Sequence, residues 1–552
     1  MKKTLTLVLA LVLCLCVMAP ALAVDYSILT DLDPEAMQKA IEWTDSLDQS
    51  GKTYDEKVTI QRATEMMSDS TDYITGDFQT LWWQDHFNFE WDLINLPSSG
   101  TNDRVRTLIN SGDMPDILDW TNYDTNEIAS YIDQGLFKEL PSDWKERWPK
   151  LAATQDFVPI AAPFSERVGG DYTLFRVTFY NNYPGETIVN HDTVYIRKDW
   201  AEAVGFELKD AYSIEEVLEF ARLVKEQDPG QLGERLIPII ANTEYLRYAF
   251  ARSNHPTFDD IYKKDGKYTW GFADQETLEL LKVWKQAYKD GLVAPEFYTY
   301  ELDDAINTFS VMGTCGVLFA AGSAGTVSDI VGNLYGEEYV DSVINGEVEK
   351  NFDKIHVASL VGNDGYYHGD ESVNYWGATY FSADIDDAVF ERYMDMMEFH
   401  CSVDWQFVKT NGFRYLDWDQ DENGEIYALD NEYETQETGW PLYHLIAVCG
   451  DDGNLNPITI DAEDKLFVPY TLSVYNTKMD LIKEDSIAKI DMDAYTLNSE
   501  KQAMMTNVNL DSIIANLIVS DGDLETEWKA AIAENAYIVE PAVEELNELF
   551  CK

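Results

Sequence analysis

The chain has 552 residues, of which 100 are Asp or Glu and only 40 are Lys or Arg, so its net charge is −60. Such an acidic surface disfavours binding to nucleic acid or anionic lipid, because both need basic side chains against their phosphates, and it favours a neutral or cationic ligand. With 45% hydrophobic residues the chain can form folded cores, and its length suits two or three domain-sized units.

Residues 1–23 have the pattern of a secretory signal peptide. Two lysines form the basic end, residues 5–17 are apolar, and an Ala-Leu-Ala cleavage motif ends the segment. The apolar run is shorter than the roughly 20 residues that a bilayer-spanning helix needs. Lipoprotein processing at Cys14 or Cys16 would call for a small preceding residue, and leucine stands there. We therefore expect export to the periplasm or cell surface without a lipid anchor, with lipid anchoring as the alternative.

The first folded unit is predicted to begin near Tyr54, after an acidic leader at residues 24–53. From residue 57 to residue 124, short apolar or β-branched runs alternate with helical patterns, giving the order strand, helix, strand, helix, strand. The last of these strands is predicted at residues 114–118. Strands separated by helices form a parallel sheet, and ligands lie beyond the carboxyl ends of its strands. The polar and aromatic side chains just after residue 118 are therefore candidates for ligand contact.

Four short segments and the C-terminal helices resemble a known family. The segments are SGDMPDI at 111–117, TVYIRKDW at 193–200, GLV at 291–293 and NYWGATYFS at 374–382. They resemble the family 1 extracellular solute-binding proteins of ABC importers, the maltose- and oligosaccharide-binding group. The resemblance covers most of the chain after about residue 55. It implies an α/β fold of the periplasmic-binding-protein type, in which two lobes with parallel-rich sheets flank a hinged cleft.

The resemblance also implies that each lobe is built from two separate parts of the chain. The expected ranges are 54–172 with about 380–480 for lobe 1, and 173–379 with about 481–552 for lobe 2. The chain is then expected to cross between the lobes near Tyr172 and again near Trp376. Strands that cross between two lobes act as a hinge.

Trp120 is the first candidate for ligand contact, because sugar-binding relatives carry a stacking tryptophan shortly after the PDI motif. A sugar offers C–H faces to an aromatic ring and hydroxyls to carboxylates and amides. The polar partners are expected among Asp119, Asn122, Tyr123 and Asp124. The alternative is that Trp120 has a structural role and packs at the end of a strand.

A second candidate group stands at the second expected crossing. It consists of Trp376 with its neighbours Asn374 and Tyr375. The same stacking and hydrogen-bonding chemistry applies to this group. Residues at a crossing can also be purely structural, and that alternative stays open.

An EF-hand-like spacing begins at Asp419. Asp421 and Asn423 follow at alternate positions, Gly424 is sixth and Asp430 is twelfth. Flanking helices are not predicted, and the Asn-Gly pair is also a signal for the turn of a β-hairpin. We therefore expect a hairpin and no metal or other cofactor, with calcium as the alternative.

Recognisable catalytic motifs are absent from the sequence, which contains no H-E-x-x-H zinc motif, no P-loop and no dinucleotide-binding glycine run. Together with the resemblance, this predicts a monomer that catalyses no reaction. It is expected to capture a sugar, in particular an oligosaccharide, and to deliver it to a membrane ABC permease. Two alternatives stay open. One is a secreted glycoside hydrolase, since an acidic chain offers many carboxylate pairs. The other is a binding protein that reports its ligand to a sensor kinase.

Overall fold

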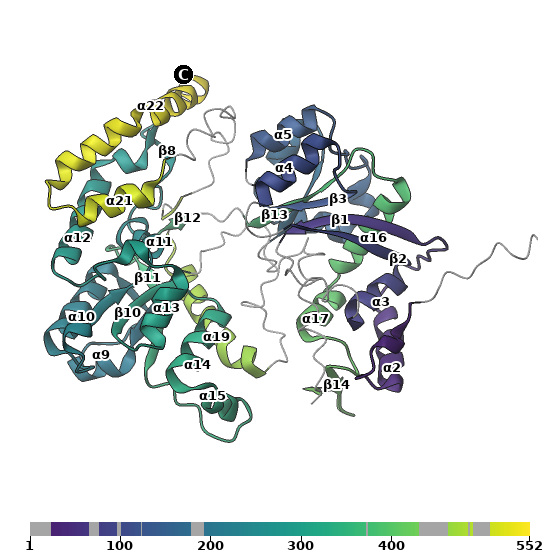
Figure 1. The fold of residues 1–552 in the computed structure, drawn as a ribbon, viewed down its shortest axis with the longest axis horizontal. Helices are drawn as coiled ribbons and strands as arrows, with labels where there is room; N and C mark the ends of the chain where they lie inside the picture. The colour runs from purple at the N-terminus through teal and green to yellow at the C-terminus, as the bar shows by residue number, and fades with distance from the viewer. Residues whose placement is uncertain are drawn as a thin grey trace, which may run out of the picture.

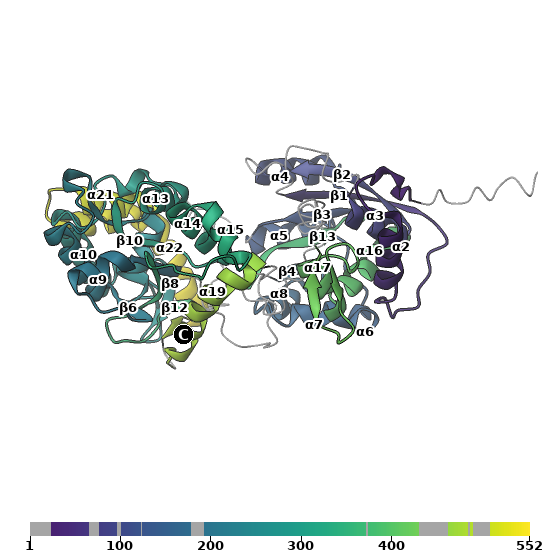
Figure 2. The same cartoon turned by 90° about the horizontal axis from the view of Figure 1, so that it is seen from below.

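The computed structural model has two lobes that lie side by side (Figures 1 and 2). It describes residues 24–65, 77–96, 101–122, 124–177, 192–370, 374–429, 462–483, 486–488 and 508–551. The expected signal peptide lies outside this part of the chain. Each lobe is built on one five-stranded sheet packed with helices, so the α/β architecture with two lobes is confirmed.

The sheet of lobe 1 has the strand order β2-β1-β3-β13-β4. Its strands are β1 (Val58–Glu65), β2 (Phe89–Leu96), β3 (Ile117–Trp120), β4 (Thr173–Val177) and β13 (Tyr375–Phe381). β1 runs parallel to β2 and β3, whereas β13 is antiparallel to both β3 and β4. Four strands therefore end at one edge of the sheet, and β13 begins there.

Helices cover both faces of this sheet. The remaining elements of lobe 1 are η1 (Tyr26–Ile28), α2 (Pro34–Asp45), α3 (Phe78–His86), α4 (Thr101–Ser111), α5 (Thr125–Asp133), α6 (Trp144–Arg147), α7 (Pro149–Gln155), α8 (Ala161–Val168), α16 (Asp387–His400), α17 (Val403–Asn411), β14 (Trp418–Gln420) and β15 (Ile426–Ala428). Helices α2, α3, α16 and α17 pack on one face, and α4, α5 and α8 pack on the other. Both faces are therefore apolar, as expected for a sheet covered by helices on both sides. Two of its four strand pairings are antiparallel, so the sheet is mixed and not parallel-rich as predicted.

The sheet of lobe 2 has the strand order β6-β11-β5-β10-β7. Its strands are β5 (Asp192–Arg197), β6 (Ala211–Ser213), β7 (Ile237–Ile240), β10 (Cys315–Ala321) and β11 (Ile355–Val361). β10 is parallel to β7 and β11 is parallel to β6, whereas β5 is antiparallel to both β10 and β11.

The other elements of lobe 2 surround this sheet (Figure 1). They are α9 (Lys198–Val204), α10 (Ile214–Gln227), η3 (Gly233–Arg235), α11 (Thr243–Arg247), η4 (Tyr248–Arg252), β8 (Ile261–Lys264), β9 (Lys267–Trp270), η5 (Gly271–Ala273), α12 (Gln275–Lys289), η6 (Phe297–Thr299), α13 (Leu302–Ser310), α14 (Ala324–Tyr335), α15 (Glu337–Ile344), β12 (Gly369–Asp370), α19 (Ala462–Asp480), β16 (Ile487–Ala488), α21 (Leu510–Val519) and α22 (Leu524–Phe550). The lobe thus combines a long central stretch of the chain with its C-terminal helices.

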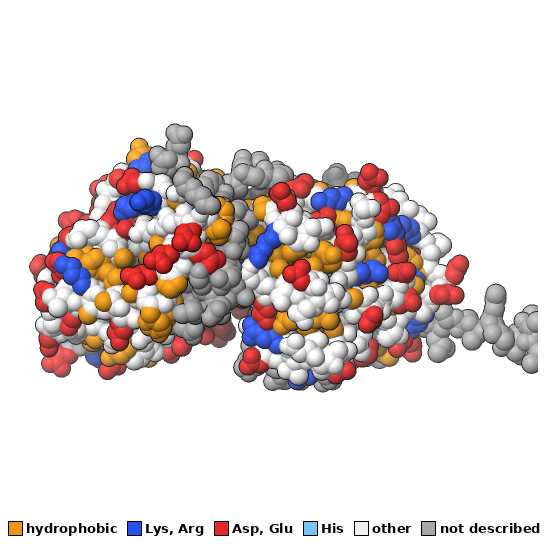
Figure 3. Space-filling view, turned by 90° about the horizontal axis from the view of Figure 1, so that it is seen from above, with side chains coloured by type: hydrophobic (Ala, Val, Ile, Leu, Met, Phe, Trp, Pro, Cys, Tyr) orange, Lys and Arg blue, Asp and Glu red, His pale blue; other side chains and the backbone are white. Residues whose placement is uncertain are grey.

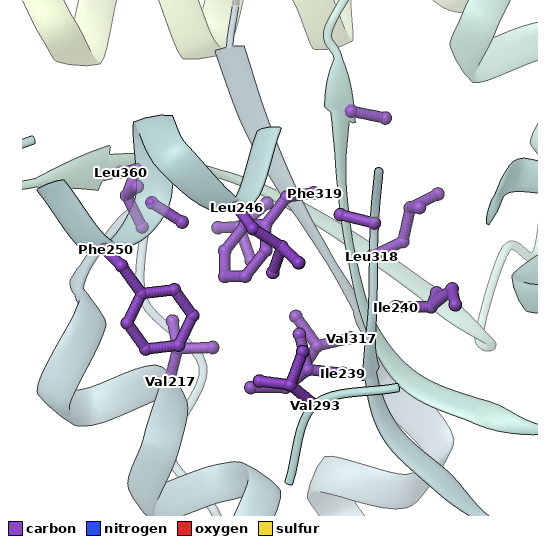
Figure 4. Close-up of a cluster of buried hydrophobic side chains, with 14 of the residues drawn as sticks. Val217, Ile239, Ile240, Leu246, Phe250, Val293, Val317, Leu318, Phe319 and Leu360 are labelled. Carbon is purple, nitrogen blue, oxygen red and sulfur yellow. The ribbon is translucent and has the colours of Figure 1, made fainter. Parts of the chain in front are cut away.

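Helix α10 shows how local sequence builds the core of lobe 2. It starts at a capping box, in which Ser213 and Glu216 each accept a hydrogen bond from the other's backbone amide. Its apolar residues recur every three or four positions and are buried. Val217 on this helix packs in one cluster with Ile239 of β7 and Val317 of β10 (Figure 4).

The antiparallel strands β5 and β13 each follow a crossing between the lobes. β5 begins at Asp192, after the chain leaves β4 in lobe 1, and β13 begins at Tyr375, after the chain leaves β12 in lobe 2. A strand that enters from the other lobe starts at the edge where its neighbours end, so it runs in the opposite direction. The carboxyl ends of the parallel strands in each lobe therefore lie at the crossing edge, where ligands of α/β sheets bind.

The structure corrects the predicted division of the chain. Residues 24–53 are not a separate leader, because Met37 and Ala40 are buried in the core of lobe 1. The predicted boundaries assign 173–379 to lobe 2, but β4 and the start of β13 pair within the sheet of lobe 1. They assign 380–480 to lobe 1, but α19 packs on α14 and β11 of lobe 2. The physical reason is that the chain crosses in the connections beside β4 and β13 and again between β15 and α19. Strand pairing and helix packing decide to which lobe each segment belongs.

The acidic side chains are not confined to one lobe. On the face shown in Figure 3, Asp and Glu side chains are spread over both lobes. Within the described ranges, no helix combines the length and the apolar composition that crossing a membrane requires.

Candidate ligand-binding site

Trp120 lies inside the core of lobe 1. β3 extends two residues beyond the predicted strand, so Trp120 is the last residue of the strand and shares a core with Leu118. The side chain is 0% exposed, and its Nε1 donates a hydrogen bond to Asn102 Oδ1 at 2.6 Å. Because the whole ring is packed, Trp120 offers no surface on which a ligand could stack in this structure. Its hydrogen bond instead holds α4 against β3.

Asp119 points to the opposite face of β3 and forms a buried ion pair with Arg62. Arg62 Nε donates to Asp119 Oδ2 at 2.6 Å, and Thr379 Oγ1 donates to Asp119 Oδ1 at 2.7 Å. The side chains of Arg62 and Asp119 are only 1% and 6% exposed. Both oxygens of this carboxylate are thus engaged within the core, and it is not available to a ligand.

Asn122 and Asp124 organise the start of α5. Asp124 is the N-cap, and its Oδ1 accepts hydrogen bonds from the backbone amides of Asn126 and Glu127 at 3.0 Å each. Asn122 Nδ2 donates to Glu127 Oε2 at 2.9 Å. Both residues are partly exposed at the edge of lobe 1 where the chain crosses to lobe 2. Their side chains are already bonded to groups of α5. Tyr123 lies outside the described residues.

The second predicted group is also packed into lobe 1. Asn374 is 2% exposed, has a left-handed backbone (φ 55°), and donates from Nδ2 to the carbonyl of Phe157 at 2.8 Å. Tyr375 is 4% exposed and makes an edge-to-face contact with Phe175, with ring centroids 5.0 Å apart. The backbone of Trp376 lies in β13, and its side chain is outside the described part of the structure.

The predicted hairpin after residue 418 is confirmed, since β14 and β15 pair in antiparallel fashion. Asp421 Oδ1 accepts hydrogen bonds from the backbone amides two and four residues later, both at 2.8 Å. Asp419 Oδ1 accepts from Arg414 Nε at 3.0 Å, and Asp430 is outside the described residues. Within the described ranges, no cluster of three or more potential metal ligands is found. The expectation that this loop holds no metal ion, with calcium as the alternative, stays a prediction.

A pocket in lobe 2 lies where the chain passes between the lobes. Its lining, called here the crossing pocket, consists of Asp192, Tyr248, Arg252, Ser253, Leu360, Tyr367, His368, Gly369 and Lys478. Asp192 is the first residue of β5, and Gly369 belongs to the last strand before the chain returns to lobe 1. Residues next to two of the crossings therefore border the pocket, which places it at the edge of lobe 2 directed toward lobe 1.

A π-helical turn supplies two of the pocket side chains. Asn242 is the N-cap of helix α11, and its Oδ1 accepts a hydrogen bond from the amide of Tyr245 at 3.0 Å. The helix continues as the π-helical η4 from Tyr248 to Arg252. The ring centroids of Tyr245 and Tyr248 lie 6.1 Å apart. π-helical turns are rare and occur frequently at functional sites, because the wider turn redirects side chains.

Two carboxylates and two phenols lie together at this edge. Burial, and then the negative charge of Asp192, raises the pKa of both Tyr245 and Tyr248. Burial also raises the pKa of Glu244, where Arg247 opposes and Asp192 adds to the effect. The phenols therefore stay protonated at neutral pH and can donate hydrogen bonds, whereas the carboxylates accept them.

Lys478 forms part of the wall of the crossing pocket. Its Nζ donates to the backbone carbonyl of Asp192 at 2.6 Å and lies 5.0 Å from the centre of the Tyr367 ring. The side chain is 1% exposed, and burial lowers the pKa of Lys478 to about 8. This bond holds α19 against the start of β5. In the chain, α19 is the next described element after β15 of lobe 1.

A larger hollow of about 570 Å³ lies among α13, α14 and α15. Its described lining includes four carboxylates, those of Asp303, Asp329, Glu337 and Asp341, and no aromatic side chain. It is formed within lobe 2 and does not include a residue at a crossing. The crossing pocket is therefore better placed for a ligand that both lobes touch, although its volume of about 20 Å³ holds no more than about one water molecule in this structure.

The sequence contains a signal for Tyr245 and Tyr248 that the motifs alone do not show. Tyr245 and Tyr248 follow the end of β7 within a few residues, as the residues near Trp120 follow β3. The rule that ligands lie beyond the carboxyl ends of parallel strands applies to both lobes. Applied to the strand at 237–240, it would have selected this pair of tyrosines.

Comparison with known proteins supports the same fold. No protein-family model matches the sequence. A curated relative, the polygalacturonan/rhamnogalacturonan-binding protein YtcQ of Bacillus subtilis (strain 168), is 23% identical over 215 residues, which are 38% of this chain. The match spans 40% of that relative's length.

Two solved structures match nearly the whole chain. The extracellular solute-binding protein from Bifidobacterium longum subsp. infantis has a TM-score of 0.64 at 14% identity, covering 91% of this chain and 100% of its own. The S. pneumoniae ABC-transporter substrate-binding protein FusA, in complex with kestose, has a TM-score of 0.60 at 16% identity, covering 89% and 98%. At these identities the likeness concerns the fold. The chain has the fold of the extracellular solute-binding proteins of ABC transporters, as its sequence resemblance predicts.

Proposed function

We propose that this chain is an exported binding protein that captures an oligosaccharide and delivers it to a membrane ABC permease. The observation that supports the proposal is the crossing edge of lobe 2, where Asp192 and Tyr248 line the crossing pocket and the ring centre of Tyr245 lies 6.1 Å from that of Tyr248. Aromatic rings match the C–H faces of a sugar, and carboxylates and phenols match its hydroxyls. The names of the similar proteins, which mention polygalacturonan, rhamnogalacturonan and kestose, support a carbohydrate.

The proposed action is capture without chemistry. The protein works as a monomer, and the ligand meets the crossing pocket of lobe 2 and the partly exposed edge of lobe 1 near Asn122. A ligand that touches both lobes binds the closed form more tightly and shifts the population toward it. The two lobes are then expected to move relative to each other as they close on the ligand. The permease, a separate protein, then receives the sugar.

Calorimetric titration with a panel of oligosaccharides tests the proposal. A sugar that binds the wild type should bind Tyr248→Ala about 5- to 30-fold more weakly, because loss of one stacking ring costs on the order of 1–2 kcal/mol. Tyr298→Ala is the matched control, since Tyr298 is a tyrosine of lobe 2 that is 50% exposed and outside the pocket. An unchanged affinity of the Tyr248 variant, with the fold intact, would contradict the assignment of the pocket.

Two further assays separate the proposal from its alternatives. Incubation of the bound sugar with the protein should release no new reducing ends, whereas release that depends on protein concentration would identify a hydrolase. Cells without this protein should lose uptake of the sugar. Normal uptake with a lost transcriptional response would indicate a partner for a sensor kinase.

A further inference from the structure

We propose that the hollow among α13, α14 and α15 is the surface on which lobe 2 docks against the membrane permease, through a basic segment on the external side of the permease. This inference rests on the proposed function and adds the place where the two proteins meet. It is carried by three features of the hollow, which are its carboxylates, its apolar floor and an exposed apolar tip beside it.

Three helices each present one face to this hollow. Helix α14 contacts both α13 and α15, and the three lie side by side in both views of the fold (Figures 1 and 2). Along each helix the lining residues recur mainly three or four positions apart, which places them on one face. In chain order they are Asp303, Ile306, Asn307, Ser328, Asp329, Gly332, Asn333, Glu337, Val340, Asp341 and Ile344.

The rim of the hollow carries four carboxylates and no basic side chain. Asp303, Asp329, Glu337 and Asp341 are all exposed, and the lining contains no Lys, Arg or His. Within the described ranges, none of the four forms a salt bridge. Like charges around one hollow repel one another, so a cationic partner is favourable there.

The arrangement of these carboxylates favours a partner with several separated positive charges. In the described part of the chain, no group of three or more His, Cys, Asp or Glu side chains is placed to hold a metal ion. The volume of about 570 Å³ is also far larger than one ion needs. The lining contains no aromatic ring, so the hollow lacks the stacking surface that suits a sugar.

Apolar side chains offer a second kind of contact at the same place. Ile306 and Val340 are nearly buried and form the floor of the hollow, whereas Val311 and Met312, directly after α13, are 61% and 66% exposed. The backbone amides of Val311 and Met312 both donate to the carbonyl of Asn307, at 2.9 and 3.0 Å, so this apolar tip continues the hollow. Exposed apolar groups beside a polar rim mark protein interaction sites. The occupant is therefore a protein segment.

The charge of the hollow selects which protein that is. An acidic rim against a basic segment is electrostatically complementary, which speeds the encounter and fixes the orientation of the two partners. A second copy of this chain would bring another strongly acidic surface, since the net charge is −60. Under the proposed function, the protein that the exported chain must meet is the permease. We expect its docking segment to carry Lys or Arg beside an apolar side chain.

Charge reversal in the hollow is the first test. Asp329→Lys/Asp341→Lys changes two exposed side chains that lie outside the crossing pocket. The purified variant should bind the sugar as the wild type does, but cells that carry it should take up the sugar at least tenfold more slowly at limiting concentration. The matched control is Glu219→Lys/Glu226→Lys, the same change in net charge on exposed positions of α10, and it should leave uptake unchanged. Equal losses of uptake in both would overturn the inference, because total charge would then explain them.

The apolar tip is tested in the same assay. Val311→Ser/Met312→Ser should slow uptake at least threefold without changing the affinity for the sugar. Val403→Ser is the matched control, since Val403 is 78% exposed on lobe 1, and it should behave as the wild type. Normal uptake by both the charge-reversed variant and the tip variant would overturn the inference and leave the proposed function standing.

Selection for restored growth on the sugar identifies the partner. Starting from Asp329→Lys/Asp341→Lys, we expect suppressor mutations in the permease genes that replace a Lys or Arg by a neutral or acidic residue. Suppressors that arise only in other genes would overturn the permease as the occupant of the hollow.

Two further outcomes separate this inference from the proposed function and from a small ligand. If cells without the protein take up the sugar normally, the proposed function fails and the inference falls with it. Spermidine is titrated into the wild type and into Asp329→Lys/Asp341→Lys as a probe for a small cation. Binding of spermidine to the wild type alone, together with normal uptake by the variant, would overturn docking and assign the hollow to a small cation.

Discussion

Asp119 and Arg62 form an ion pair that is almost completely shielded from water in lobe 1. In Asp119→Ala the guanidinium would stay buried without its partner, and breaking a buried pair in this way costs about 3–5 kcal/mol. We therefore expect the variant to lower the free energy of unfolding by that amount, measured by denaturant titration. Asp113→Ala is the control, because Asp113 is exposed on the same lobe and should change stability by less than about 0.5 kcal/mol. A stable Asp119 variant that has lost ligand affinity would instead restore Asp119 as a ligand contact.

His86 links α3 to the N-terminal segment of lobe 1. Its Nδ1 lies 2.9 Å from Asp45 Oδ1, its Nε2 lies 3.1 Å from Asp48 Oδ2, and its side chain is 14% exposed. Burial lowers the pKa of His86, but the hydrogen bonds to the two carboxylates outweigh it and raise the pKa to about 9. The unfolded chain has a histidine pKa near 6.5. The contribution to stability is therefore complete below pH 6.5 and is lost as the pH rises through 9.

The variant His86→Gln tests this pH dependence. It is expected to lose on the order of 1–3 kcal/mol of unfolding free energy at pH 6, because it removes hydrogen bonds between charged groups. At pH 10 it should differ little from the wild type, whose imidazole is then neutral. Denaturant titrations of both proteins between pH 6 and 10 give the comparison. A difference that is the same at both ends of this range would show that packing alone, and not charge, holds His86.

Helix α5 is an element whose first turn lies at the crossing edge of lobe 1. Its N-cap, Asp124, accepts two backbone hydrogen bonds, and Asn122 donates to Glu127 in the first turn of the helix. Loss of an N-cap side chain costs about 1 kcal/mol. Asp124→Ala should thus lower the free energy of unfolding by about 1 kcal/mol, whereas Asp124→Asn, which can still cap, should be close to the wild type in the same thermal or denaturant measurement. Equal losses in both variants would show that the charge of Asp124, and not its capping bond, is what matters.

At the scale of the whole molecule, the connections beside β4 and β13 join two separately cored lobes. A ligand that bridges them is expected to shift the population toward a closed form, so the radius of gyration from solution scattering should fall at saturating oligosaccharide. The Tyr248→Ala variant at the same sugar concentration serves as the control and should close less. An identical scattering curve with and without saturating sugar in the wild type would show that the lobes do not close on the ligand.

The sequence by itself determined the local elements and the class of the fold. The strand and helix pattern of residues 57–124, the cap at Ser213 and the hairpin turn before β15 depend on contacts between residues a few positions apart. Such contacts are present in any window of the sequence, and hydrophobic periodicity reports them. The family resemblance extended this to two lobes, which the structure confirms.

Only the tertiary structure decided which side chains are available to a ligand. β3 extends two residues beyond the predicted strand, so Trp120 lies in the core and not in a loop. Asp119 forms an ion pair with Arg62, which is 57 residues away in the chain. The crossing pocket joins Asp192, Tyr248 and Lys478, which are far apart in the chain and meet through strand order and the packing of α19. Burial and ion pairing depend on such distant partners. A local pattern can therefore predict that a residue suits a ligand, but the partners that occupy it are set by the packing of the whole lobe.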